Sequence, residues 1–159
     1  MKEQTLTCCL WFDGQAEEAA RFYASILPES GLGHITRSPT DYPAGRQGDV
    51  LMVEFTLMGR PFVALNAGPN TRFNEAVSFQ IPVLNQAEAD RYYQQLSAVP
   101  EAEMCGWVRD KYGVSWQIVP EQLVAYIRES DTPRARRVFQ AMMQMRRIDV
   151  AGIEAAARG

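Results

Sequence analysis

Two short stretches of this 159-residue chain, 15-QAEEAARFY-23 and 86-QAEADRYY-93, are near copies of each other. Both begin with Gln-Ala-Glu and, with one residue dropped, both end in arginine followed by two aromatic residues. Each stretch follows an apolar run rich in β-forming residues, 6–12 in the first copy and 77–83 in the second. Two strand-to-helix starts about seventy residues apart predict an internally duplicated domain.

The residues around the first copy predict a strand, a helix and three further strands. The pattern predicts that Asp13 and Gly14 end the first strand and offer an N-cap, and that Pro28 ends the helix. Alternating apolar residues then favour further strands. The four expected strands cover residues 5–12, 31–38, 49–57 and 61–66.

The second copy repeats this order. Asn85 and Glu88 form a capping box for the second helix, which follows a strand over 76–83. Strands are then expected over 104–109 and 114–119, on either side of a turn, and the module's third strand is the least defined of the set. The pattern divides the chain into a first module (1–66), a linker loop (67–75), a second module (76–120) and C-terminal helices (121–159).

The C-terminal part predicts three helices, over 121–129, from Thr132-Pro133 to about residue 147, and from Asp149 to 157. The middle one carries five arginines beside several methionines. Such a run is more typical of an amphipathic helix than of a nucleic-acid-binding one, with methionines packed on the body of the protein or on another subunit. A partner surface of this kind predicts a homodimer.

Composition and charge argue against two classes of protein. A formal net charge of -3 does not suit a protein that coats nucleic acid, and no apolar run is long enough to span a bilayer. The N-terminus lacks the pattern of a signal peptide.

Three cysteines, Cys8, Cys9 and Cys105, fit neither a disulfide framework nor a closed zinc site. We therefore expect reduced thiols and a cytoplasmic location.

Three segments are similar to one known family. Residues 10–14 with 16–19 and 22–23, the run 105-CGWVRDKYGVSWQIVP-120, and residues 142–145 with 148–151 resemble the PhnB-like branch of the vicinal-oxygen-chelate superfamily. That superfamily includes glyoxalase I, bleomycin-resistance proteins and extradiol dioxygenases. The resemblance implies an α+β fold in which two paired β-α-β-β-β modules form a half-open, cup-shaped sheet, with the C-terminal helices as an appendage.

This branch often carries the description 3-demethylubiquinone-9 3-methyltransferase-like. A typical methyltransferase holds its sulfonium cofactor at a glycine-rich turn after the first strand of a parallel sheet. Here Gly31-x-Gly33 precedes a strand and is too short for that motif. Methyl transfer is therefore not expected, and no cofactor is predicted.

The metal-using relatives take four ligands, usually His, Gln or Glu, from paired strands of the two modules. The comparable positions here lie near residues 6–8, 64–66, 76–78 and Gln117, and none is His, Asp or Glu. The single histidine, His34, has no evident partner in the sequence. The usual chelate site is therefore expected to be absent.

Polar residues in phase on apolar strands are the candidate ligand-binding groups. Uncharged polar groups on such strands either hydrogen-bond with one another or face a wet pocket or a ligand. The candidates are Thr7, Cys9, Trp11, Asn66, Ser78, Gln80, Ser115 and Gln117. The loops over 39–49 and 66–75 could cover the cup with Tyr42, Arg46, Arg72 or Phe73.

Glu54 is a carboxylate within the strongly apolar strand 49–57. If buried in the cup it could act as a general base; otherwise it is structural. Two hypotheses therefore stay open. The chain is a metal-independent protein that binds a small, partly aromatic molecule, or it is an enzyme of isomerase, lyase or dioxygenase type that uses Glu54 or a non-standard metal site.

Overall fold

The computed structural model describes residues 6–159, which form two compact units. The first unit ends at Arg72 and the second begins at Phe73, within the loop predicted over 67–75. The C-terminal helices belong to the second unit. The fold is of the α+β class, as predicted. The pairing of the two modules around one cup stays a prediction, and each unit is described by itself below.

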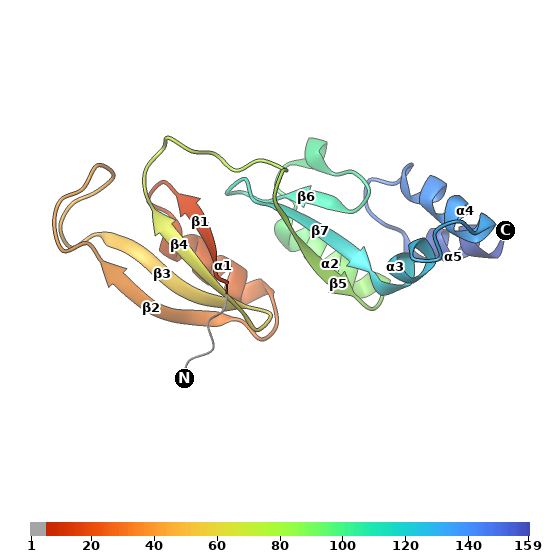
Figure 1. The fold of residues 1–159 in the computed structure, drawn as a ribbon, viewed down its shortest axis with the longest axis horizontal. Coiled ribbons are helices and arrows are strands. Elements are labelled where there is room, and N and C mark those ends of the chain that lie inside the picture. The colour runs from red at the N-terminus through yellow and green to blue at the C-terminus, as the bar shows by residue number, and fades with distance from the viewer. Residues whose placement is uncertain (1–5) are drawn as a thin grey trace. The chain divides into compact units, whose positions relative to one another are not determined.

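The first unit has the predicted order of elements, β-α-β-β-β (Figure 1). Its sheet has the order β1-β4-β3-β2, with β1 parallel to β4 and the other pairs antiparallel. The elements are β1 (Cys8–Phe12), α1 (Ala16–Ile26), β2 (Gly31–Arg37), β3 (Val50–Leu57) and β4 (Arg60–Asn66). Leu6 and Thr7 precede β1 instead of belonging to it, and Thr5 lies outside the described residues.

Helix α1 packs on one face of this sheet through small residues and one tyrosine. Ala16, Ala19, Ala20 and Tyr23 are fully buried, as are facing residues of β3 and β4. The predicted N-cap was wrong, because the cap is Gln15, whose side chain makes no capping bond. The backbone N–H of Ala16 instead donates to the side chain of Asn66, at the end of β4.

The second unit repeats the first with one strand fewer. Its sheet has the order β5-β7-β6, and β5 is parallel to β7 just as β1 is to β4. Residues 73–159, all described, contain no counterpart of β2; the short 3₁₀ helix η1 lies in that interval. The elements are β5 (Ser78–Val83), α2 (Gln86–Leu96), η1 (Pro100–Ala102), β6 (Trp107–Arg109) and β7 (Ser115–Pro120).

The capping box of α2 is confirmed in part, because Asn85 caps the helix but Glu88 binds the N–H of Leu84 and not that of Asn85. The Asn85 side chain accepts from the Glu88 N–H at 3.0 Å, and the Glu88 carboxylate accepts from the Leu84 N–H at 2.8 Å. The strand predicted over 104–109 is shorter than expected, because Cys105 and Gly106 have φ of 51° and 87° and turn the chain. Only Met104 remains bridged to Trp107 beyond β6.

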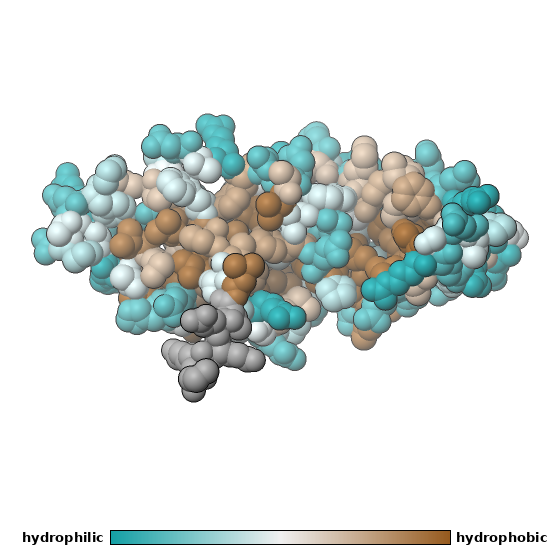
Figure 2. Space-filling view, in the orientation of Figure 1, coloured by the Kyte–Doolittle hydropathy of each residue, from teal (hydrophilic) through white to brown (hydrophobic). Residues whose placement is uncertain are grey.

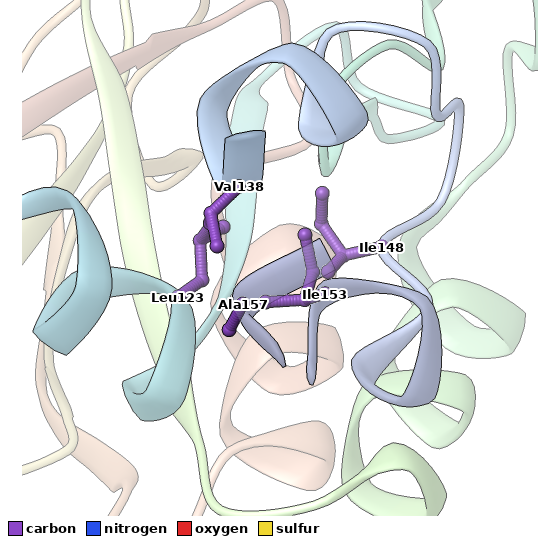
Figure 3. Packing of buried hydrophobic residues seen from close by; sticks show 5 residues of the cluster. All are labelled: Leu123, Val138, Ile148, Ile153 and Ala157. Carbon is purple, nitrogen blue, oxygen red and sulfur yellow. The ribbon is translucent and has the colours of Figure 1, made fainter. Parts of the chain in front are cut away.

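Helices α3 (Glu121–Ile127), α4 (Pro133–Met142) and α5 (Val150–Arg158) form a small core of their own. Figure 3 shows its five buried side chains directed toward one another. They are Leu123, Val138, Ile148, Ile153 and Ala157. Met142 and Met145 pack against this cluster, so these two methionines contact the body of the protein.

The prediction that the middle helix extends to about residue 147 was wrong, since α4 ends at Met142. The carbonyl groups of Met145 and Arg146 accept from the N–H groups of Cys105 and Gly106, which draws this segment out of the helix and along the turn. Within residues 6–159, no helix is long and apolar enough to cross a membrane.

Candidate functional site

The face of the first sheet opposite α1 carries half-buried apolar residues that no helix of the first unit covers. Strand register places Trp11 beside Leu65, and Glu54 and Cys9 on either side of Val63. We call this surface the open face of the first sheet. It comprises Cys9, Trp11, Met52, Glu54, Thr56, Val63 and Leu65. The brown, hydrophobic side chains over β1, β3 and β4 in Figure 2 show this concentration of apolar surface.

Trp11 is held in place at one edge of the open face. Its indole N–H donates to the carbonyl oxygen of Gly68 at 2.7 Å. Gly68 has φ of 89°, and a Cβ there would lie 3.2 Å from the Cβ of Ala44, so the position favours glycine. The hydrogen bond and the tight turn together fix the orientation of the indole ring. The ring is half-buried and presents a flat apolar surface.

A hollow of about 660 Å³ lies at the β2, β3 and β4 side of the first unit. Thr7, Gly33, Glu54, Thr56 and Val63 contribute to its lining. The first unit therefore brings two of the predicted site residues, Thr7 and Glu54, to one depression. Glu54 is exposed in the first unit. Its proposed role as a base required burial, and the first unit alone does not bury it.

Cys9 lies on the open face as an exposed free thiol. Desolvation around the sulfur raises the pKa of the Cys9 thiol. A raised pKa leaves little thiolate at neutral pH, and the thiolate is the nucleophilic form. Cys9 is therefore suited to a lining role and not to nucleophilic catalysis.

The open face of the second sheet is polar. Gln117 donates through Nε2 to Ser78 Oγ at 2.8 Å, and Gln80 Nε2 lies 3.4 Å from Gln117 Oε1. Parallel register accounts for the contact, because β5 and β7 align Gln80 directly with Gln117. Three predicted residues therefore meet. They hydrogen-bond with one another, which is one of the two arrangements that the alternation allowed.

Ser115 extends this polar row and is buried, with 3% of its surface exposed. Register places it between Ser78 on β5 and Arg109 on β6. Arg109 donates to Glu75 at 3.2 Å, and its Nε is buried without a hydrogen-bond partner. Arg109 and Glu75 were not among the predicted site residues. The alternation of β6 could have revealed Arg109, but nothing local connects it with Glu75.

Asn66 does not join the other candidates. Its side chain is buried on the helix side of the first sheet, where Nδ2 donates to the Val50 carbonyl at 2.8 Å and Oδ1 accepts from Ala16 at 2.9 Å. Both polar atoms are therefore occupied by backbone groups. We interpret Asn66 as a structural residue that joins β4, β3 and α1, which corrects its assignment to ligand binding.

The loop residues expected over a cup divide between the units. Tyr42 forms a tight bridge with Gly45, and Arg46 lies in the same loop of the first unit, where its N–H donates to the Asp49 carboxylate at 2.7 Å. Arg72 ends the first unit and Phe73 begins the second. Their role as a cover stays a prediction.

Metal-ligand chemistry at the strand positions does not fit the superfamily chelate. Among residues 6–159, no three His, Cys, Asp or Glu side chains gather as a metal-binding group. His34 is exposed on β2. The one buried strand-end amide at a comparable position, Asn66, already bonds two backbone groups.

Comparisons with known proteins agree with this architecture. A family model described as 3-demethylubiquinone-9 3-methyltransferase matches residues 4–119, which end one residue before β7 does. The chain belongs to this family, the PhnB-like branch of the vicinal-oxygen-chelate superfamily.

Solved structures resemble the chain over the same region. A Bacillus cereus PhnB protein, described as a 3-demethylubiquinone-9 3-methyltransferase, is 32% identical, with 74% of this chain and 99% of that one covered and a TM-score of 0.61. A Pseudomonas aeruginosa protein is 19% identical, covering 75% and 98%, with a TM-score of 0.57. A comparison with curated proteins gives no match.

Proposed function

We propose that the chain binds a small, partly aromatic molecule against the open face of the first sheet, without a metal ion. The fixed ring of Trp11 carries the proposal, because an aromatic wall held by a 2.7 Å hydrogen bond needs no reordering when a flat ligand stacks on it. Leu65 and Val63 continue the apolar surface, and Glu54 and Thr56 supply polar groups beside it. The hollow of about 660 Å³ that Glu54, Thr56 and Val63 help to line adjoins this surface, and depressions with apolar walls and few polar groups are typical of ligand sites.

The resemblance to bleomycin-resistance proteins suggests sequestration of the bound molecule as the role. Covering the apolar open face gains about 25 cal/mol for each Å² removed from water. That gain requires no chemistry on the ligand.

An enzyme of the same superfamily is the alternative. Glu54 and Glu29 both line the 660 Å³ hollow, and of these two carboxylates Glu54 is the one on the open face of the first sheet. Methyl transfer is not proposed. Gly31 and Gly33 both lie inside β2, and not in a phosphate- or cofactor-binding turn that follows a strand.

Fluorescence of Nile red, a neutral aromatic dye that brightens in apolar sites, tests the proposal. We expect saturable binding that EDTA does not change, and Trp11→Ala weakens it about tenfold or more. Leu84→Ala, which removes an exposed apolar side chain of the second unit, is the matched control and leaves binding unchanged. Equal binding by Trp11→Ala and the wild type would contradict the site.

Metal analysis separates the two hypotheses. The binding proposal predicts no stoichiometric divalent ion in untagged protein. One tightly held divalent ion per chain, coordinated by strand residues, would favour the enzyme. Turnover of any tested small molecule that Glu54→Gln abolishes, with stability unchanged, would do the same.

The proposal includes a homodimer in the cytoplasm. Val77, Leu84 and Phe139 of the second unit are large, exposed apolar side chains that suit a protein partner. The three cysteines are free thiols, as in a reducing compartment. Sedimentation velocity tests the dimer, and a monomer at micromolar concentration would contradict it.

A further inference from the structure

Cys105 occupies a backbone position that cysteine rarely adopts. Met104 and Trp107 are bridged, with Trp107 donating to the Met104 carbonyl at 2.8 Å, and the two residues between them have φ of 51° and 87°. Two positive φ angles define a tight turn of the mirror-image kind, which strongly favours Asn-Gly, Asp-Gly or Gly-Gly. Gly106 is required, since a Cβ there would lie 2.8 Å from the Ile118 carbonyl. The turn therefore presents a thiol where a small polar residue is usual.

The segment after α4 is fastened to this turn. Cys105 donates its N–H to the Met145 carbonyl at 2.8 Å, and Gly106 donates to that of Arg146 at 3.0 Å. These bonds bring Met143 to the turn, so that its Sδ lies 3.9 Å from Cys105 Sγ. Residues 38 positions apart thus place a thiol and a thioether side by side.

Two more thioethers line the same hollow. Met104 and Met142 join Cys105 and Met143 in the wall of a depression of about 580 Å³. Met104 is 63% exposed and Met143 is 48% exposed, so neither side chain is buried in the core. The cluster consists of four sulfur-containing side chains within one unit, at a place that small ions can reach.

We propose that these residues bind one copper(I) ion, or another soft monovalent ion of the same preference. Thiolate and thioether sulfurs are soft ligands that suit copper(I), whereas hard ions prefer oxygen ligands. Two sulfurs each about 2.3 Å from a metal, at the angle of trigonal coordination, are about 4.0 Å apart. The 3.9 Å separation of Cys105 and Met143 matches this value before any rearrangement. Met104 or Met142 supplies the third sulfur.

Binding requires the thiolate form of Cys105. The thiol releases its proton to water as the Cu–S bond forms, and the metal keeps its oxidation state. Binding therefore weakens as the pH falls. The site uses no strand position of the superfamily chelate and is independent of the proposed ligand site on the first sheet.

Anaerobic competition with a chromophoric copper(I) chelator tests the proposal. The protein carries Cys8→Ser and Cys9→Ser, which remove the other two thiols from β1. We expect it to withdraw one copper(I) per chain. Cys105→Ser in this background abolishes the withdrawal, and Met143→Leu weakens the affinity about tenfold or more.

Met145→Leu is the matched control, because it also replaces a thioether by an apolar side chain. Met145 packs toward Gly152 and the helical core instead of lining the hollow. It keeps the full affinity, and thermal unfolding confirms that each variant folds. No copper(I) withdrawn by the double serine variant would overturn the proposal. So would equal affinity of the Met143→Leu and Met145→Leu variants.

Discussion

Trp11 and Gly68, 57 residues apart in the chain, are joined by a 2.7 Å hydrogen bond from the indole N–H to the glycine carbonyl oxygen. This bond connects β1 with the loop that follows β4, and it sets the orientation of the aromatic ring on the open face of the first sheet. The proposed ligand site depends on that orientation more than on any charged group.

Trp11→Phe keeps an aromatic ring and removes the hydrogen bond. We expect the free energy of unfolding to fall by about 1 kcal/mol, the usual net value of one such bond, and Nile red to bind several-fold more weakly. Urea denaturation and dye titration measure the two effects. Unchanged dye affinity with reduced stability would show that the fixed ring orientation does not matter for binding.

Gly33 allows β2 to approach Glu54. A Cβ at Gly33 would lie 3.1 Å from the Glu54 carbonyl oxygen and 3.3 Å from its Cβ, whereas a Cβ at Gly31 would meet nothing within 4 Å. Gly33→Ala should therefore destabilise the protein by about 1 kcal/mol. Gly31→Ala, the matched control on the same strand, is neutral or slightly stabilising because it restricts the unfolded chain. Thermal unfolding of the two variants tests this, and equal melting temperatures would contradict it.

The side chains of Asn66 and Asn85 each accept a hydrogen bond from a backbone N–H in the first turn of a helix, but only Asn66 is buried. Asn66→Ala leaves the Ala16 N–H and the Val50 carbonyl without their partner and should cost about 2–3 kcal/mol. Asn85→Ala removes an exposed cap and should cost about 1 kcal/mol. Chemical denaturation compares them. A smaller cost at Asn66 than at Asn85 would mean that water replaces the buried bonds.

Glu103 attaches the C-terminal segment to the second unit. Its buried carboxylate accepts from Arg147 at 2.7 Å and from Ser97 at 2.6 Å, and Arg146 lies 3.8 Å away. The hydrogen bond from Arg147, helped by that from Ser97, lowers the pKa of Glu103 despite its burial. A carboxyl group with a lowered pKa stabilises the fold above its unfolded pKa of about 4.3, and this stabilisation is lost as the pH falls through the folded value.

Glu103→Gln should therefore reduce stability at pH 7 by about 2 kcal/mol. The difference from the wild type should shrink as the pH falls below about 4. Glu17→Gln, which removes the exposed pair with Arg21 on α1, is the control and should change stability by less than about 0.5 kcal/mol. Denaturation curves between pH 3 and pH 7 would contradict the account if the effect of Glu103→Gln were constant over that range.

Local patterns predicted most of the fold because they act within one element. Alternation located the strands, and the Asn85–Glu88 capping box located α2. The same alternation predicted that Ser78 and Gln80 lie on one face of their strand, and that Ser115 and Gln117 lie on one face of theirs. The parallel register of β5 and β7 then places Ser78 beside Ser115 and Gln80 beside Gln117. Whether these residues bind a ligand stays a prediction.

Long-range contacts account for what the sequence did not predict. The amide of Asn66 caps a helix that begins 50 residues earlier, so its role could not be read from its neighbours. The run over 104–109 resembles a strand, but Cys105 and Gly106 have positive φ angles and turn the chain. A Cβ at Gly106 would lie 2.8 Å from the Ile118 carbonyl, a tertiary contact that the local pattern does not reveal. The end of α4 depends on bonds from Cys105 and Gly106, which lie some forty residues before it and are invisible to helical periodicity.

The indole N–H signals of the three tryptophans test the central claim most directly. Trp11 reports on the open face of the first sheet, Trp107 on that of the second, and Trp116, which donates to Asp110 at 2.8 Å, on the buried helix side. In ¹H–¹⁵N correlation spectra recorded in EDTA, titration with 1-naphthol, a neutral bicyclic aromatic, should shift the Trp11 signal saturably and leave that of Trp116 in place. A Trp11 signal that does not move, or moves only after a divalent metal is added, would contradict the account.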